Sequence, residues 1–311
     1  LDGDFKGWGS SYGDNLSYNC KCNICNKETL VDNKIRCYNC YPINSNSSLL
    51  EKEIVSFIQQ NYKGKINTSV RDLIYNTDNP YPLELDIYLP DLNLAFEVNG
   101  TYWHSSKFKY RDYHQNKTEK ALKQGIQLIH IWEHVWLNKQ SIVKSMILNK
   151  LNKTPNKAHA RKCTVKKVNH LEASLFLEIN HLHGKGKPAT VIKGLYSENK
   201  LVSIMSVSKD GELLRFASLL NHNIVGGFGK LFKALRPYIK YSYVDRDWSP
   251  NNLNTVYDKF FSKVGQTSIR YSYLEEYTLN IIPRQRIDFD NPSFKEGLLK
   301  IYGTNNFKYE V

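Results

Sequence analysis

The sequence contains no run of eighteen apolar residues, and no charged-then-apolar segment follows Leu1. The first absence excludes a hydrophobic membrane-spanning helix, and the second excludes a typical secretory signal. Internal repeats and low-complexity tracts are also missing, so a repeat architecture is not indicated. We therefore expect a soluble, intracellular protein with no membrane partner. The start at Leu1 rather than at methionine indicates a fragment or a trimmed form of a longer chain.

Acidic residues are scarce relative to basic ones, with 30 Asp and Glu against 43 Lys and Arg, a formal net charge of +13. Such a surplus predicts attraction to a polyanion and binding that weakens with salt. The surplus is concentrated between Lys107 and Lys167, where fifteen basic residues face three acidic ones. We expect nucleic-acid phosphates to bind along this segment. The alternative is an ordinary solvated surface rich in lysine.

Cysteine is nearly absent outside one short segment, because five of the six thiols lie between Cys20 and Cys40. Two Cys-x-x-Cys pairs separated by eleven residues have the spacing of a zinc ribbon, which predicts a structural Zn²⁺ rather than disulfides. Cys20 is an alternative to the first ligand, and Cys163 is interpreted as an ordinary small apolar residue. The predicted zinc ligands are Cys22, Cys25, Cys37 and Cys40.

Two carboxylates stand out in the segment that spans residues 83–104. Apolar and polar residues alternate on both sides of Pro90-Asp91, which predicts a β-hairpin. With Leu89 paired to Leu92 across a two-residue loop, Asp86 would face Ala95 and lie diagonally beside Glu97 on one face. Two converging carboxylates suit Mg²⁺, which can polarise a phosphodiester and activate water. The alternative is a solvated hairpin whose acids have no function.

These residues resemble the PD-(D/E)XK nuclease superfamily, in particular the branch of the very-short-patch repair endonuclease and of phage-encoded homing endonucleases. The resemblance covers about residues 49–137. It implies a restriction-endonuclease-like core with helices flanking a mixed sheet, in which Asp86 and Glu97 hold Mg²⁺. Asn99 replaces the lysine of the usual Glu-x-Lys motif, a departure that is typical of this branch.

The resemblance assigns further polar residues to the same site. The stretch from Gly100 to His104 is similar to a Gly-x-x-Trp-His motif, which makes His104 a candidate acid or base. His114 and Lys117, three residues apart, would share one helix face and meet the metal or a phosphate. Glu51 is similar to a helical glutamate of the family, with Glu53 as the alternative. The candidate catalytic residues are therefore Glu51, Asp86, Glu97, Asn99, His104, His114 and Lys117.

The length of 311 residues predicts more than one domain, and we expect an α/β protein of the α+β type with three parts. These are a zinc ribbon (1–47), a nuclease domain (48–152) and a second α/β domain (157–311). In the nuclease domain we expect a helix after the hairpin, a strand at 126–132 and a helix that ends at about Leu151. An earlier helix would begin at Leu49, with Ser47 or Ser48 as its N-cap. Large aromatics near strands usually fill cores, so core positions are expected for Trp103, Trp132 and Trp136.

The C-terminal part resembles the acetyltransferase (GNAT-like) fold, chiefly in its Gly226–Gly229 turn and in Tyr243–Ser249. Such a turn can hold a pyrophosphate, of a coenzyme or of a DNA strand. The match is weak, and the alternative is a helix start that needs glycine for close packing. The turn lacks the basic residue that usually leads the acetyltransferase motif, so coenzyme binding stays open.

The combined features predict a metal-dependent, site-specific endonuclease that hydrolyses double-stranded DNA, of phage or mobile-element type, in the cytoplasm of a bacterium. Alternatives are an acyltransferase-like modifier that binds DNA and a regulator that binds without cutting. Homing, repair and restriction, or nicking and double-strand cleavage by a homodimer, are not separated by these residues. The predicted DNA contacts are Lys107, Lys109, Arg111, Arg161, Lys162, Arg215 and Arg246.

Overall fold

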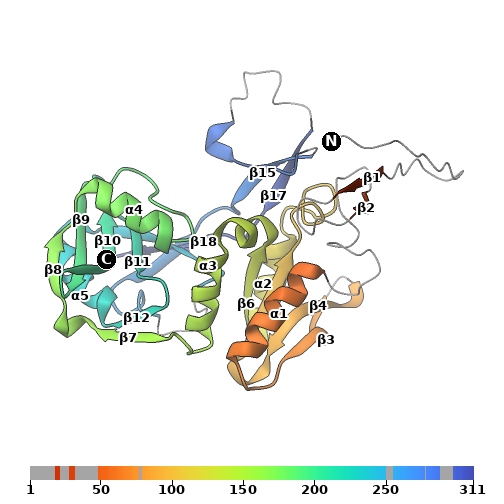
Figure 1. The fold of residues 1–311 in the computed structure, drawn as a ribbon, viewed down its shortest axis with the longest axis horizontal. Helices are drawn as coiled ribbons and strands as arrows, with labels where there is room; N and C mark the ends of the chain where they lie inside the picture. Colours follow the sequence, from red (N-terminus) through yellow and green to blue (C-terminus); the bar gives the residue numbers. More distant parts are fainter. Residues whose placement is uncertain are drawn as a thin grey trace, which may run out of the picture. The chain divides into compact units, whose positions relative to one another are not determined.

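The computed structural model describes residues 18–21, 28–31, 48–76, 79–249, 255–276, 278–287 and 297–311, with the backbone alone at 18–21, 28–31, 76 and 79–81. The chain divides into two compact units, Leu1–Ile58 and Gln59–Val311. Helices and several sheets, some of mixed direction, alternate along it, which confirms the predicted α+β class (Figure 1). In the described ranges, no helix is long and apolar enough to cross a membrane.

The first unit contains an antiparallel pair of strands, β1 (Tyr18–Lys21) and β2 (Glu28–Val31), and most of helix α1 (Leu49–Asn61). The Glu51 amide donates to Ser48 Oγ at 3.1 Å, which settles the N-cap predicted at one of two serines. Ile54 and Ile58 are fully buried on α1. The four predicted zinc ligands, Cys22, Cys25, Cys37 and Cys40, lie outside the described residues.

A four-stranded sheet with the order β3-β4-β5-β6 opens the second unit. The first three strands are antiparallel, and β6 joins β5 in parallel. Helix α2 packs against β3 and β6, and α3 packs against β6. The elements are β3 (Asn67–Asn76), β4 (Asn79–Leu89), the 3₁₀ turn η1 (Pro90–Leu92), β5 (Leu94–Asn99), α2 (Tyr113–Lys123), β6 (Gln127–Trp132) and α3 (Glu133–Lys150).

The predicted hairpin exists, but its predicted register is wrong. Leu89 pairs with Leu94 rather than with Leu92, and Tyr88 rather than Asp86 faces Ala95. The reason is the loop, which contains the η1 turn and Asn93 in the left-handed conformation with φ of 47°. Four residues thus connect the strands. Continuing this register by one residue sets Asp86 directly opposite Glu97, closer than the predicted diagonal.

A seven-stranded sheet with the order β14-β18-β13-β11-β10-β9-β8 dominates the rest of the unit, and only β11 and β13 pair in parallel. Phe176 and Leu177 of α4 pack on one face, and Phe228, Leu231 and Phe232 of α5 pack on the other. The elements are β8 (Thr164–Lys167), α4 (His170–Asn180), β9 (Val191–Ser197), β10 (Lys200–Val207), β11 (Glu212–Ser218), α5 (Gly227–Leu235), β13 (Tyr241–Asp245), β14 (Ser262–Gln266) and β18 (Asn306–Glu310).

Shorter elements complete the second unit. They are the parallel pair β7 (Asn156–His159) and β12 (His222–Val225), the sheet of β15 (Tyr271–Glu275), β16 (Ile281–Pro283) and β17 (Leu298–Tyr302), and the 3₁₀ turns η2 (Ala160–Lys162), η3 (Arg236–Tyr238) and η4 (Arg284–Arg286).

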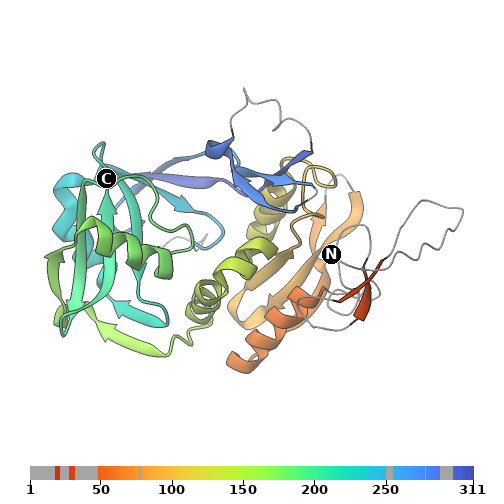
Figure 2. The ribbon, with the colours of Figure 1, turned by 45° about the horizontal axis from the view of Figure 1, so that its top comes forward.

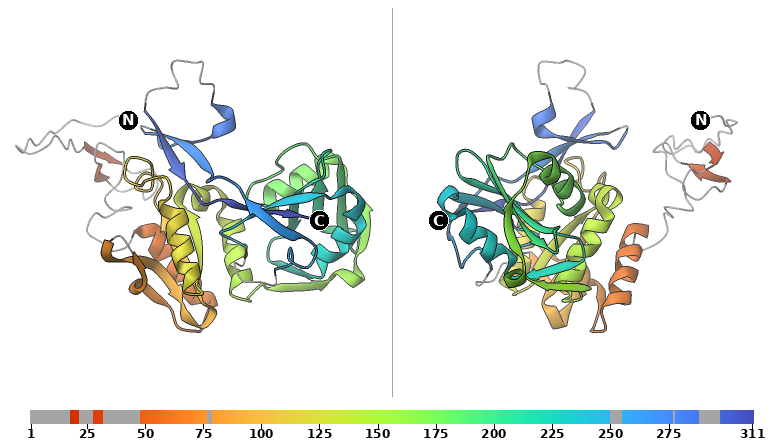
Figure 3. Two further views of the ribbon diagram at one scale, coloured as in Figure 1. Left: turned by 180° about the vertical axis from the view of Figure 1, so that it is seen from behind. Right: turned by 60° about the vertical axis from the view of Figure 1, so that its left-hand side comes forward.

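The strands near the C-terminus connect the two large sheets. Figures 2 and 3 show these blue strands extending from the seven-stranded sheet toward the loop after β5. There Ser105 forms a bridge with Ile301, and Tyr102 packs with Leu274 and Ile301. The amide of Asn305 also donates to Gln115 Oε1 on α2 at 3.1 Å. The predicted boundary at residues 152–157 therefore falls inside one compact unit.

Candidate functional site

The predicted carboxylate pair forms on the four-stranded sheet. Glu97 lies on the central strand β5 and is almost completely buried, while Asp86 on β4 is half-buried. The main-chain amide of Val98 on β5 donates to Asp86 Oδ2 at 2.7 Å, which holds that carboxylate beside β5. Within the described residues, Glu97 Oε2 is buried and has no hydrogen-bond partner. An orphaned buried oxygen is costly, so this atom is a candidate ligand for a cation.

Lys117 completes the pair from the neighbouring helix. Its ammonium on α2 forms an ion pair and hydrogen bond with Glu97 Oε1, and both side chains are about as buried as the core, at 3% and 4% exposure. The predicted meeting of Lys117 with the acidic residues is thus present in the structure. The lysine reaches the site from the helix, whereas the position two residues after Glu97 holds Asn99.

The electrostatics of this group follow from burial. Burial raises the pKa of Glu97 to about 7, with Lys117 opposing the shift and Asp86 adding to it. Burial likewise raises the pKa of Asp86, again against the effect of Lys117. Burial alone would lower the pKa of Lys117, but Glu97 and Asp86 raise it, so the amine stays protonated. The single ammonium of Lys117 does not balance two ionised carboxylates, so the group can bind a further cation.

Three histidine rings pack beside the carboxylates. His104 and His114 are stacked with centroids 5.1 Å apart, and His130 on β6 meets the edge of His114 at 5.1 Å. Burial lowers the pKa of His104 to about 3 and that of His114 well below its usual value, so both rings are neutral. Neither nitrogen of His114 nor Nδ1 of His104 has a partner in the part of the chain that the structure describes. Both neutral rings therefore have nitrogens that are free to hydrogen-bond to a ligand or to water.

His130 is the residue of this cluster that sequence analysis missed. Its Nδ1 lies 3.1 Å from Asn99 Nδ2, and its Nε2 lies 2.8 Å from Thr118 Oγ1. The strand register sets His130 beside Glu97. The signal was a polar residue within the apolar run of residues 126–132, which had been interpreted only as a central strand.

The donor set was tested for its fit to Mg²⁺. The described residues contain no group of three or more His, Cys, Asp or Glu side chains arranged to hold a metal. Two carboxylates are nevertheless enough for Mg²⁺, which binds proteins through one or two carboxylates and takes water and phosphate oxygens for the rest. The orphaned Glu97 Oε2 fits such a ligand. Glu51, in the first turn of α1, belongs to the first unit, so its predicted support of the metal stays a prediction.

The sequence matches no known protein-family model and no curated protein.

Three of the predicted DNA contacts lie on the loop between β5 and α2. Arg111 and Lys107 are exposed, with Lys107 paired to Glu276, and the Lys109 ammonium lies 4.2 Å from the ring centroid of Tyr113. Aromatic side chains on the same loop are open to solvent: Trp103, Phe108 and Tyr110 are 49%, 44% and 61% exposed. The core position predicted for Trp103 is wrong, whereas Trp136 is fully buried as predicted.

The other predicted DNA contacts are in the second half of the chain. Arg161 and Lys162 are exposed on η2. Arg215 is half-buried and donates from Nε to the Gly184 carbonyl at 3.0 Å. Arg246 is 4% exposed, and its guanidinium donates to Glu119 Oε1 at 3.2 Å and to Asn305 Oδ1 at 3.1 Å. The partners of Arg246 are therefore internal, and they join α2 to the C-terminal strands.

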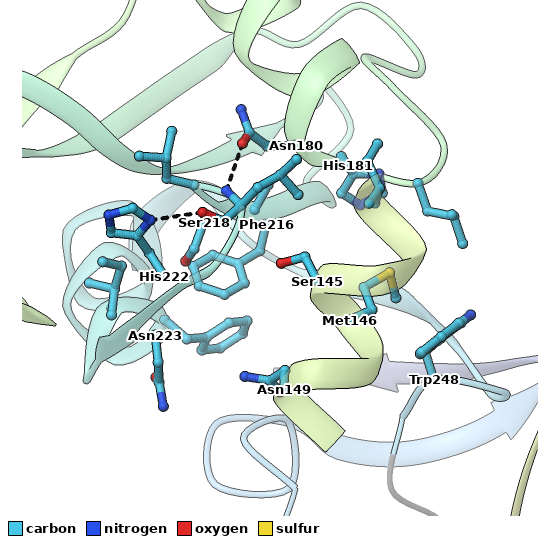
Figure 4. Close-up of a pocket in the computed structure, with 18 of the residues that line it drawn as sticks. Ser145, Met146, Asn149, Asn180, His181, Phe216, Ser218, His222, Asn223 and Trp248 are labelled. Atoms are coloured by element: carbon cyan, nitrogen blue, oxygen red, sulfur yellow. Dashed lines mark hydrogen bonds between the residues drawn. The ribbon is translucent and has the colours of Figure 1, made fainter. Parts of the chain in front are cut away.

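A cavity of about 770 Å³ lies between α3, the end of β11, the strand β12 and the start of α5 (Figure 4). Its walls include Phe216, Trp248 and His181, and no acidic side chain of the described ranges lines it. Burial lowers the pKa of Lys150, at one end of the cavity, to about 8, and its ammonium donates to Gln127 Oε1 at 3.1 Å. An acid-free cavity with a lysine favours an anionic ligand.

The glycines at this cavity have structural explanations. Gly226 has φ of +77° and is the N-cap of α5. A Cβ on Gly227 would lie 3.1 Å from Ile224 Cγ2, and one on Gly229 would lie 3.2 Å from Phe260. Packing and backbone conformation thus account for the glycines at this helix start, the explanation held open beside ligand binding.

Proposed function

We propose that this protein is a Mg²⁺-dependent endonuclease that hydrolyses phosphodiester bonds in double-stranded DNA, with a PD-(D/E)XK-like core of the phage or mobile-element type. The observation that carries the proposal is the buried group of Asp86, Glu97 and Lys117, contributed by two adjacent strands and a helix. Burying two acids and a lysine together is expensive for a protein that only needs to fold, so such groups mark functional sites.

Each side chain has a role that its surroundings support. Asp86 and Glu97 would hold Mg²⁺, which when bound supplies a Lewis acid and a source of nucleophilic water. Lys117 favours the ionised form of Glu97 against the effect of burial and places a positive charge where negative charge develops on the phosphate. His104 and His114, which are neutral because they are buried, have ring nitrogens without a partner among the described residues and would position the attacking water.

Duplex DNA is the proposed partner. Three exposed aromatic side chains and three basic ones share the loop that follows β5, directly after the candidate site. Basic groups bind phosphates and aromatic faces stack on bases, so this loop suits a nucleic acid better than an acidic protein. A zinc ribbon formed by Cys22, Cys25, Cys37 and Cys40 and a GNAT-like C-terminal sheet would position the DNA. The proposed location is the cytoplasm of a bacterium.

The test is cleavage of supercoiled and linear DNA by the purified chain in Mg²⁺, with EDTA as a blank and ends mapped by sequencing. Asp86→Asn and Glu97→Gln should abolish discrete cuts. Asp72→Asn is the matched control, because it also neutralises a carboxylate of the same sheet and Asp72 is exposed on the neighbouring strand β3. Retention of cuts by Asp86→Asn would overturn the proposal, and DNA binding without any cuts would favour a regulator.

A second function is favoured by the acid-free cavity beside α5. Together with the parallel pairing of β11 and β13 in the seven-stranded sheet, it supports an acyltransferase-like modifier built on that sheet. Isothermal titration with acetyl-coenzyme A separates the two proposals. Tight binding that is lost in Lys150→Ala, with DNA left uncut, would move the activity to this cavity.

A further inference from the structure

Asn99 is fully buried and has one end of its amide unpaired. It lies two residues after Glu97 on β5, so the period of two in a strand directs both side chains to the same face of the sheet. Asn99 Nδ2 lies 3.1 Å from His130 Nδ1, whereas Asn99 Oδ1 has no partner among the residues that the structure describes. Glu97 Oε2 is likewise buried and has no hydrogen-bond partner among the described residues. Two orphaned oxygens therefore neighbour each other on one strand face.

The contacts of His130 agree with one orientation of the Asn99 amide. The NH₂ group of Asn99, 3.1 Å from His130 Nδ1, can only donate, so Nδ1 carries a lone pair and accepts from it. The single proton of the ring then lies on Nε2, which faces α2 and donates to Thr118 Oγ1 at 2.8 Å. The amide oxygen has to point the other way.

We infer that Asn99 Oδ1 is the third oxygen donor of the divalent-cation site, beside Asp86 and Glu97, and that His130, held by Thr118, is the positioning residue that aims it. This inference rests on the proposed function and extends it to the metal's ligand set. A neutral amide oxygen adds a ligand without adding a negative charge, which matters where two carboxylates already share one ammonium. In the Glu-x-Lys motif of the PD-(D/E)XK superfamily, a lysine stands at the position that Asn99 has here. Lys117 would supply the positive charge of that lysine, so position 99 can hold an oxygen ligand instead.

The test is the affinity of the full chain for Mn²⁺, measured by electron paramagnetic resonance, together with cleavage in Mg²⁺. Asn99→Ala and His130→Leu should each weaken Mn²⁺ binding by about tenfold, as is usual when a ligand's support is removed. In Asn99→Asp an oxygen also replaces the NH₂ group, so either end of the side chain can bind the ion. Adding His130→Leu to this variant should therefore leave its Mn²⁺ affinity unchanged. His134→Leu is the matched control, since His134 is a half-buried histidine, kept neutral by desolvation, that contacts Thr101 instead.

Several outcomes separate this inference from the proposed function. An Mn²⁺ affinity in Asn99→Ala within roughly twofold of the wild type would overturn the inference, even if Asp86→Asn abolishes cleavage. Mn²⁺ binding that depends on Asn99 and His130, with no cleavage by any form, would support the inference and reject the nuclease. Nitrogen-15 NMR of the wild type provides a check that needs no variant to fold: a protonated Nδ1 on His130 would also overturn it.

Discussion

At the scale of single residues, the ion pair of Lys117 and Glu97 is the first feature to test. Removing one buried charge leaves the other uncompensated, which costs about 3–5 kcal/mol, while replacing both with neutral groups costs much less. We expect Lys117→Met to lower the free energy of unfolding by about this amount, and Lys117→Met with Glu97→Gln to recover a large part. Urea unfolding of the two single variants and the double variant measures the coupling.

The control for this cycle is a surface pair. Arg71→Met with Glu84→Gln removes an ion pair whose arginine is 72% exposed, and its coupling should be near zero. Equal coupling for the two pairs would show that burial adds nothing to the Lys117 pair.

A second test at this scale concerns Asp247. Burial raises its pKa to about 7, with Asp245 adding to the shift and Arg270 opposing it. The native state therefore keeps a proton that the unfolded chain loses above a pKa of about 3.9. Stability from this group is present at low pH and is lost as the pH rises through that window. The quantity to follow is the free energy of unfolding of the wild type minus that of Asp247→Asn. This difference should decrease as the pH rises from about 4 to 7.

Because the comparison subtracts one unfolding curve from the other, the titration of groups that do not interact with Asp247 cancels, whereas that of its neighbour Asp245 stays in the difference. A difference that stays flat across this pH window would mean that Asp247 is ionised in the native protein.

At the scale of elements, the sequence predicted what lies close together in the chain. Helices α1, α2 and α3 and strand β6 follow from caps, periodicity and an apolar run, and the hairpin follows from alternation. Strand β3 was missed because its pairing with β4 shifts twice, between Val70 and Ile74 and between Ile74 and Asn76, which breaks the alternation of its side chains. The register error has a similar origin, since a 3₁₀ turn and one left-handed residue leave no distinct pattern.

The loop that determines this register yields a prediction. Asn93 adopts φ of 47°, a conformation that a β-branched residue enters at a cost of about 1–2 kcal/mol. We expect Asn93→Val to lower the free energy of unfolding by about this amount and Asn93→Gly to leave it nearly unchanged. Asn67→Val is the matched control, because Asn67 lies in the β3 strand opposite Tyr88, where valine is favourable. A harmless Asn93→Val in thermal and urea unfolding would contradict the loop conformation.

At the scale of the whole molecule, the sequence could not reveal how the two large sheets are joined. The joining contacts pair residues far apart in the chain, such as Gln127 with Asp247 and Gln115 with Asn305. No local pattern marks them, because glutamine and asparagine are ordinary surface residues. The candidate site was predictable for the opposite reason: its acids, Lys117 and two histidines lie within one stretch with recognisable spacing. His130 escaped notice because its role depends on Thr118 and Asn99, which only the fold brings to it.

If these joining contacts act as one interface, the two large sheets unfold together. The Gln127 amide donates at 3.1 Å to the carbonyls of both Asp247 and Ser249 and accepts from Lys150, so truncation leaves several half-buried groups unpaired. We expect Gln127→Ala to reduce stability by about 1–3 kcal/mol. In native-state hydrogen exchange, protection should fall equally in β5, which pairs with β6 at Gln127, and in β10 of the other large sheet. Asn149→Ala, which removes only an exposed contact to Thr154, should change neither. Loss of protection confined to β5 would mean that the sheets are independent domains after all, each stable without the other.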